Sequence, residues 1–443
     1  MINQHLGRYD TYQDSEIEGL GKVPANWGIS RIKERGSVKA RVGWKALKAS
    51  EYVEDGYAFL STPNIKTKEI DFKNVNYITY ERYMESPEIM LKKDDILLAK
   101  DGSTLGTVNI VTHLPRETTV NSSIGVLRFD HTIFNKYLFY QIESKYIQDK
   151  IKLKKSGMGV PHLFQQDINN FIILIPPLEE QKVIAKYLDV KTDQIDKKIE
   201  LLNQKAIQYK KVKQSLVHES VTRGLDRTVS MKDSGIKWIG EIPEHWNVSS
   251  ITNITSIVSK KNFPKEELLS VYRDFGVIIK STRDDNHNKA GQDLSKYKLV
   301  EPGFLVINKM KAWQGSLGVS EFRGIVSPAY ITCKTDGKVV ERRYLHHLLR
   351  SRSYVNEYNR LSYGVRVDQW DMRYDDFKYV PVLLPPIEEQ KAIATYLDSK
   401  MNHIDLIIET INSKIRKLRE LRETLVNDVV TGKIKVAMEG VIV

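Results

Sequence analysis

The chain has 443 residues, enough for about two to four domains, and it carries a net charge of +12 with 28% of its residues charged. A cationic excess of this size suits a polyanionic partner, either a nucleic acid or a membrane surface. The single cysteine excludes an internal disulfide framework and a cysteine-rich zinc site. The first residues are polar, and no apolar run reaches the roughly 20 residues of a membrane-spanning helix, so we expect a cytoplasmic protein.

Two blocks of sequence occur twice, and they organise the chain. The block DSEIEGLGKVPANW at Asp14 returns as DSGIKWIGEIPEHW at Asp233, and LIPPLEEQKVIAKYLD at Leu174 returns as LLPPIEEQKAIATYLD at Leu383. The repeats predict six segments in chain order: an N-terminal segment 1–27, a first variable domain 28–173, a first long helix 174–226, a repeat of the N-terminal segment 227–246, a second variable domain 247–382, and a second long helix with a tail 383–443.

The two variable domains are rich in β-branched and aromatic residues and contain glycine turns. ILLAKDGSTLGTVNIV near Ile96 and FLVINKMKAWQGSLGVS near Phe304 both predict a strand, a loop with glycine and a second strand. Each domain ends with a short helical stretch and then an apolar strand. We therefore predict an α/β fold in which one module is duplicated.

The two long helices give the clearest periodicity. Paired prolines followed by two glutamates are typical of a helix start, which predicts a first helix from Leu178 to about Thr222, roughly 65 Å long. Glycine follows each helix, as is common at helix ends. Apolar residues recur every seven positions, which predicts two coiled-coil helices with these seam residues: Leu188, Ile195, Leu202, Tyr209, Leu216, Leu397, Ile404, Ile411, Leu418 and Leu425.

Catalytic motifs are scarce. The sequence contains no phosphate-binding P-loop, no G-x-S-x-G nucleophile elbow and no H-E-x-x-H zinc motif, and its histidines have no metal-ligand spacing. A Glu-x-Lys pattern at Glu180 and at Glu389 also occurs in metal-dependent nucleases, but here it lies in the first turn of a long helix rather than on a core strand. We therefore expect a binding protein that is not itself an enzyme and holds no metal.

Basic and amide side chains recur at equivalent places in the two variable domains. Such groups contact DNA phosphates and base edges. An ordinary solvated basic loop remains the alternative for any one of these residues. The predicted DNA-binding set is Lys100, Ser103, Thr104, Lys154, Lys155, His162 and Gln165 in the first domain, and Lys309, Lys311, Trp313, Gln314, Arg366, Gln369, Trp370 and Arg373 in the second.

With PPLEEQKVIAKYLD, PPIEEQKAIATYLD, DSGIKWIGEIPEHW and the closing LRETLVNDVVTGKIKV, the chain resembles the specificity subunit of Type I restriction–modification systems along almost its whole length. The resemblance implies two target recognition domains on antiparallel helices, each recognising one half of a split, asymmetric double-stranded DNA site. It also implies partners: modification subunits that methylate adenine with S-adenosylmethionine, and ATP-driven, magnesium-dependent restriction subunits. The chain itself is then expected to bind no cofactor.

Three alternatives remain open from the sequence. The chain could be a coiled-coil scaffold that binds DNA without recognising its sequence, a stand-alone nuclease, or the specificity subunit of a related restriction or phage-defence system.

We also expect the N-terminal segment to pack beside the end of the second helix, because its repeat directly follows the first helix. Lengthening a helix should change the gap in the DNA site without changing either half.

Overall fold

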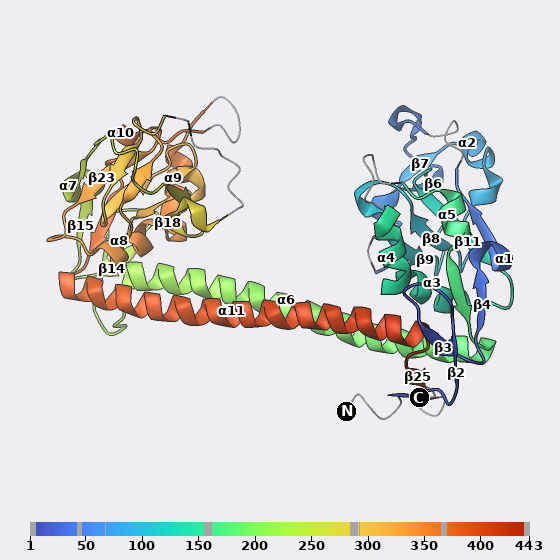
Figure 1. Cartoon of the computed structure of the whole chain (residues 1–443). Coiled ribbons are helices and arrows are strands. Elements are labelled where there is room, and N and C mark those ends of the chain that lie inside the picture. Colours follow the sequence, from blue (N-terminus) through green and yellow to red (C-terminus); the bar gives the residue numbers. More distant parts are fainter. Residues whose placement is uncertain are drawn as a thin grey trace. The chain divides into compact units, whose positions relative to one another are not determined.

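The computed structural model describes residues 6–41, 47–66, 68–154, 162–283, 291, 293–364 and 370–437. The chain forms two compact units (Figure 1). Unit 1 consists of Met1–Leu201 with Ser413–Val443, and unit 2 consists of Leu202–Asn412. Each unit therefore contains one globular domain together with parts of both long helices. Among the residues that the structure describes, no helix is long and apolar enough to cross a membrane.

The domain of unit 1 is built on an antiparallel sheet in the order β5-β11-β8-β9. Its central strand β8 is buried along its whole length because it carries four apolar side chains in a row. A second sheet, in the order β10-β6-β7, contains one parallel pairing, between β10 and β6. The strands are β5 (Gly36–Lys39), β6 (Tyr57–Leu60), β7 (Asn76–Ile78), β8 (Ile96–Ala99), β9 (Val108–Ile110), β10 (Thr118–Val120) and β11 (Ile124–Phe129).

The helices of this domain follow the sheets in the chain. α3 (Asn135–Glu143) and α4 (Lys145–Lys154) supply one side of the main core, including the fully buried Tyr137. The chain then returns as β12 (Ile172–Ile175), which pairs with β4 (Gly28–Arg31) just before the first long helix. Three shorter helices complete the domain: α1 (Ile32–Arg35), α2 (Tyr80–Met84) and α5 (Gln165–Asn169).

The domain of unit 2 repeats this plan. Its main sheet has the order β16-β23-β20-β21, and a parallel bridge between Leu268 and Ile325 links the two-stranded sheets β17-β18 and β19-β22. The predicted strand–loop–strand segments and the duplicated α/β module are thus confirmed. The elements are β15 (Asn247–Ser250), α7 (Ile251–Ile254), β16 (Thr255–Ile257), β17 (Leu269–Tyr272), β18 (Gly276–Ile279), β19 (Lys298–Val300), β20 (Phe304–Ile307), β21 (Leu317–Val319), β22 (Gly324–Val326), β23 (Ile331–Thr335), α8 (Arg342–Leu349), α9 (Arg352–Leu361), α10 (Tyr374–Phe377) and β24 (Pro381–Leu384).

The two long helices are α6 (Leu178–Arg223) and α11 (Ile387–Val430). They run antiparallel in both units. In unit 1 the start of α6 packs on the end of α11, and Asp196 pairs with Arg422 at 3.2 Å. In unit 2 the end of α6 packs on the start of α11, and Lys213 pairs with Asp405 at 2.6 Å. All ten predicted seam residues are buried or half-buried, whereas Leu201 and Leu406, which lie off the seam, are exposed.

The repeated blocks cover the ends of the helices. β1 (Leu6–Gly7) pairs with β25 (Lys435–Val436), and the hairpin of β2 (Tyr12–Asp14) and β3 (Lys22–Pro24) leads to Trp27, which packs with the last turn of α11. In unit 2 the hairpin of β13 (Met231–Asp233) and β14 (Glu241–Pro243) leads to Trp246, which packs with Val221 at the end of α6. The predicted packing of the N-terminal segment beside the second helix is therefore confirmed.

Candidate DNA interface

In unit 1 the structure brings two segments of the predicted DNA-binding set together. One is the loop between β8 and β9, which contains a 3-10 turn at Gly102–Thr104, and the other is the segment that leads into α5. The backbone N–H of Leu163 donates to the carbonyl oxygen of Lys100 at 2.8 Å. Beside this bond the side chains of Asp101 and His162 form a hydrogen bond. The two segments are therefore held as one surface although they lie far apart in the sequence.

In unit 2 the equivalent segments are joined in the same way. The backbone N–H of Met372 donates to the carbonyl oxygen of Lys309 at 3.0 Å. The Lys309 ammonium pairs with Asp371 at 2.9 Å. Trp313, in the 3-10 turn Ala312–Gln314, lies 5.3 Å from the ring of Trp370, measured between ring centroids. Four members of the predicted set, counting Gln314 of the same turn, are thus collected at one place.

The two sites share a backbone link but differ in their chemistry. Lys309 and Met372 follow Lys100 and Leu163 at the offset that also separates the two copies of the helix phrase. In unit 1 the loop contributes the acid, Asp101, and the other segment contributes a histidine. In unit 2 the loop contributes the cation, and the other segment contributes the acid. The backbone link thus fixes the surface in both domains, while the side chains on it vary.

Several polar and aromatic groups at these sites are open to solvent. Ser103 and Gln165 are exposed in unit 1, where the neighbouring Phe164 ring is 64% exposed. In unit 2, Lys311 and Arg373 are exposed, and the Arg373 guanidinium lies 5.0 Å from the ring centroid of Tyr363. Lys100, Thr104, His162, Lys309, Trp313, Gln314 and Trp370 are half-buried. Exposed cations, amides and aromatic rings are the groups that bind phosphates and base edges.

For most of the remaining predicted residues, the structure gives no side-chain position. Lys155, Arg366 and Gln369 lie outside the described residues, as does the side chain of Lys154 at the end of α4. Gln165 is exposed, and its amide donates to the backbone oxygen of Val38 in β5.

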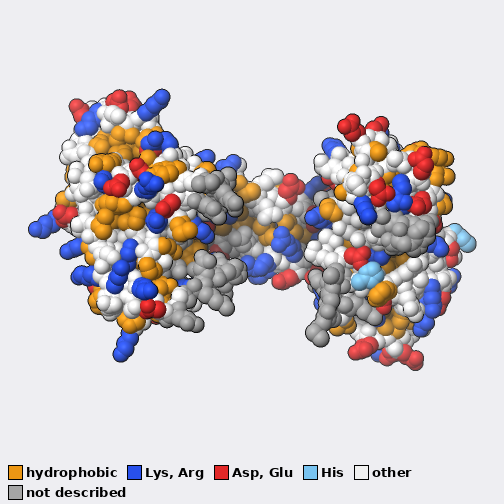
Figure 2. Space-filling model, turned by 90° about the horizontal axis from the view of Figure 1, so that it is seen from above, with side chains coloured by type: hydrophobic (Ala, Val, Ile, Leu, Met, Phe, Trp, Pro, Cys, Tyr) orange, Lys and Arg blue, Asp and Glu red, His pale blue; other side chains and the backbone are white. Residues whose placement is uncertain are grey.

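Figure 2 shows Lys and Arg side chains spread over the visible face of each unit among acidic and apolar ones. Charge alone therefore singles out no area of that face.

Sequence reasoning missed the two carboxylates of the sites, Asp101 and Asp371, and the exposed ring of Phe164 in unit 1. Cations and amides are the groups expected to contact DNA, whereas these carboxylates hold the loops and carry no such signal. A usable signal was present in unit 2, because an acidic residue stands directly before Met372, at the offset shared by the repeats. Comparing the two domains position by position would have aligned Asp371 with His162, a residue that the sequence had already placed in the site.

The Glu-x-Lys pattern has a structural role. Glu180 accepts a hydrogen bond from the Tyr9 hydroxyl at 2.5 Å, and burial together with this bond raises the pKa of Tyr9. Glu389 accepts hydrogen bonds from the Trp246 indole N–H at 3.1 Å and from His245 at 2.8 Å. Glu180 thus ties the N-terminal segment to α6, and Glu389 ties the repeat of that segment to α11. Within the described part of the chain, no group of three or more His, Cys, Asp or Glu side chains could hold a metal ion.

Known proteins are similar to this chain in sequence along almost its whole length. A relative from Methanocaldococcus jannaschii, the Type I restriction enzyme MjaVIII specificity subunit, is 30% identical, and the alignment covers 95% of this chain and 96% of the relative. The EcoKI specificity subunit from Escherichia coli strain K12 is 23% identical over 94% of this chain and 90% of its own length. Both relatives are matched along nearly their entire lengths.

Solved structures share the fold at low identity. A chain from a study of complex assembly and conformational transition in the type I R-M system has a TM-score of 0.67 at 17% identity, covering 92% of this chain and 98% of that one. The HsdS subunit from Thermoanaerobacter tengcongensis has a TM-score of 0.50 at 17% identity, covering 94% of this chain and 99% of that one. The family model described as the Type I restriction modification DNA specificity domain matches residues 24–210 and 243–417. The chain therefore belongs to the Type I restriction modification DNA specificity family.

Proposed function

We propose that this chain is the sequence-recognition subunit of a Type I restriction–modification complex, and that each domain recognises one half of a split double-stranded DNA site. One observation carries the proposal: the same pair of loops is joined by the same backbone link in both domains. A fold that keeps the link and varies the side chains suits a protein that must recognise two different short sequences with one architecture. Family membership along most of the chain supports this role.

The two half-sites should differ in sequence. Unit 1 presents Ser103, Gln165 and the exposed Phe164 beside its loop, whereas unit 2 presents Lys311 and Arg373 beside its own. Arginine and lysine donate to guanine, while glutamine pairs with adenine and an apolar ring contacts the thymine methyl group. Different groups at equivalent positions predict different bases, so the complete site is asymmetric.

Catalysis is assigned to the partners. We propose that the chain docks modification subunits that methylate adenine with S-adenosylmethionine and restriction subunits that use ATP and magnesium, and that it performs no reaction itself. The structural use of Glu180 and Glu389 supports this division, because both carboxylates of the nuclease-like pattern accept hydrogen bonds from the N-terminal segment or its repeat.

The interface is tested by reversing charge in the loop of unit 2. Lys309→Glu is expected to weaken binding to the cognate site by about 10- to 100-fold, because it removes a cation of the candidate interface and sets two carboxylates against each other at the link to Asp371. Lys311→Glu makes the same charge change at a lysine that forms no ion pair within the described ranges, and it is expected to act in the same direction. Binding is measured with the assembled modification complex on cognate and unrelated duplexes at two salt concentrations.

Lys338→Glu is the matched control. Lys338 is exposed in the turn between β23 and α8, outside both loops, so it carries the same charge change without touching the proposed interface. The affinity of the Lys338→Glu variant for the cognate DNA site should stay close to that of the unmodified chain. Equal losses in all three variants, on cognate and unrelated DNA alike, would instead favour a scaffold that binds DNA without recognising its sequence.

A further inference from the structure

The helix phrase that occurs twice contains a buried glutamine, although the charged residues around it in the sequence suggest an exposed position. Gln181 lies in the first turn of α6 and is only 1% exposed. Its amide oxygen accepts from the backbone N–H of Phe134 at 2.8 Å, and its amide nitrogen donates to the backbone oxygens of Thr132 at 3.0 Å and Pro176 at 2.9 Å. The helix is thereby joined to the loop that precedes α3.

Unit 2 repeats these contacts at the matching residue. Gln390 is 0% exposed in the first turn of α11. It accepts from the backbone N–H of Glu341 at 2.8 Å and donates to the backbone oxygens of Val339 at 3.1 Å and Pro385 at 2.9 Å. All six partner atoms in the two units belong to the backbone. The connection is therefore independent of the side chains that the domain carries in this loop.

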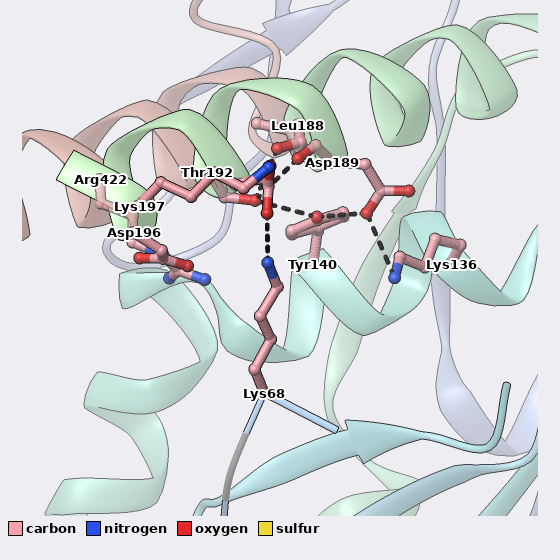
Figure 3. Close-up of polar contacts among 10 residues, drawn as sticks. Lys68, Lys136, Tyr140, Leu188, Asp189, Thr192, Asp196, Lys197 and Arg422 are labelled. Carbon is pink, nitrogen blue, oxygen red and sulfur yellow. Dashed lines mark hydrogen bonds and ion pairs between the residues drawn. The ribbon is translucent and has the colours of Figure 1, made fainter. Parts of the chain in front are cut away.

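A second connection lies eight residues, about two turns, further along each helix. It uses side chains, and these differ between the units. Asp189 on α6 accepts from the Tyr140 hydroxyl at 2.6 Å and pairs with Lys136 at 3.2 Å, both from α3 (Figure 3). In unit 2 the aspartate at the same place in the phrase, Asp398, pairs with His347 at 2.8 Å and Arg343 at 2.9 Å, both from α8.

The partner helix also holds each domain. In unit 1, Arg422 of α11 pairs with Glu143 at 3.1 Å, and Asn427 accepts from the backbone N–H of Tyr146 at 3.1 Å. In unit 2, His218 of α6 is hydrogen-bonded to Ser353 of α9 at 2.9 Å. A domain that is tied to two helices at separate points has little freedom to tilt on them.

We propose that Gln181 and Gln390 are positioning residues that fix the orientation of each recognition domain on the helix pair and thereby determine which gap between the two DNA half-sites is accepted. The proposal rests on the proposed function. Neither glutamine lies in the candidate DNA interface, so each acts through the domain that it holds. Burial without competing water keeps their hydrogen bonds short and directional, which suits a fixed orientation.

Gln141 is a matched control that distinguishes a positioning role of Gln181 from a role in stability alone. This glutamine lies on α3, is 1% exposed and also makes three hydrogen bonds, to the Tyr137 hydroxyl at 2.7 Å and to the backbone of Leu174 at 2.8 and 2.9 Å. Its partners lie in α3 itself and in β12. Methionine at this position removes as many buried hydrogen bonds as at Gln181 but leaves the contact between the helix and the loop before α3 intact.

The experiment compares Gln181→Met with Gln141→Met in the assembled modification complex. The substrates are DNA libraries that carry the two half-sites of the unmodified chain, separated by gaps that vary one base pair at a time. For Gln181→Met, methylation at gaps one base pair longer or shorter is expected to rise about tenfold relative to the native gap, while the bases required in each half stay the same. Gln141→Met should keep the native gap profile.

Each other outcome is informative. An unchanged gap profile for Gln181→Met, or equal broadening in both variants, overturns the proposal. If Gln181→Met fails to assemble, Gln390→Met provides the second variant, because it removes the matching hydrogen bonds in unit 2. It should broaden the gap profile in the same way, and an unchanged profile then overturns the proposal. If the unmodified chain supports no gapped motif at all, the proposed function fails rather than this inference.

Discussion

Replacing residues 28–173 with the corresponding domain of another specificity subunit is expected to change one half of the recognised DNA sequence completely and to leave the other half unchanged. The loops that form the candidate interface of unit 1 lie within this range, and those of unit 2 lie outside it. The recognised sequence is measured by mapping methylated adenines in DNA modified by the chimeric complex.

The structure gives a physical reason why a foreign domain should dock. The hydrogen bonds between Gln181 and the domain loop go to backbone atoms, so an incoming domain with different side chains can form the same hydrogen bonds. The reciprocal exchange of residues 247–382 is the control and should change the other half alone. A change in both halves after either exchange would contradict independent recognition by the two domains.

Trp246→Ala is expected to lower the free energy of unfolding of unit 2 by about 3–5 kcal/mol, the usual range for removing a large buried aromatic side chain. Trp246 is 0% exposed and packs with Val221 and Ile242 where α6 ends. Its indole N–H donates to Glu389, which the truncation leaves without this partner. The truncation therefore loosens the end of α6 and the start of α11 together.

The loss is measured by denaturant unfolding, with hydrogen exchange assigning it to unit 2. Trp370→Ala provides the comparison, because Trp370 is half-buried beside the candidate interface rather than in the core, and its loss should be clearly smaller. A loss below about 1 kcal/mol for Trp246→Ala would contradict the role assigned to the repeated block, since most core truncations exceed it.

The helices and the repeat were predictable from the sequence because local signals agree there. The paired prolines and glutamates predicted a start at Leu178, and the structure begins α6 at that residue and ends it at Arg223, one residue beyond the predicted end. Heptad spacing identified seam residues that the structure buries or half-buries. The strand–loop–strand segments followed from apolar runs on either side of a loop that contains glycine.

The side-chain links were not predictable in the same way. Asp101 and His162 are 61 residues apart, and nothing local in the sequence pairs them. Gln181 and Gln390 lie among charged residues at the start of amphipathic helices, so the pattern indicates solvent exposure, and their burial depends on the loop that folds over them. The available signal was the recurrence of glutamine at the same place in both copies of the phrase.

The most direct test of the central claim is methylation mapping by single-molecule sequencing. A host lacking its own systems would express the candidate modification subunit with and without this chain. A gapped, asymmetric, two-part adenine motif that is methylated only when the chain is present is the predicted result. A stable complex of the two subunits that methylates no such motif would contradict the claim that this chain recognises DNA sequence.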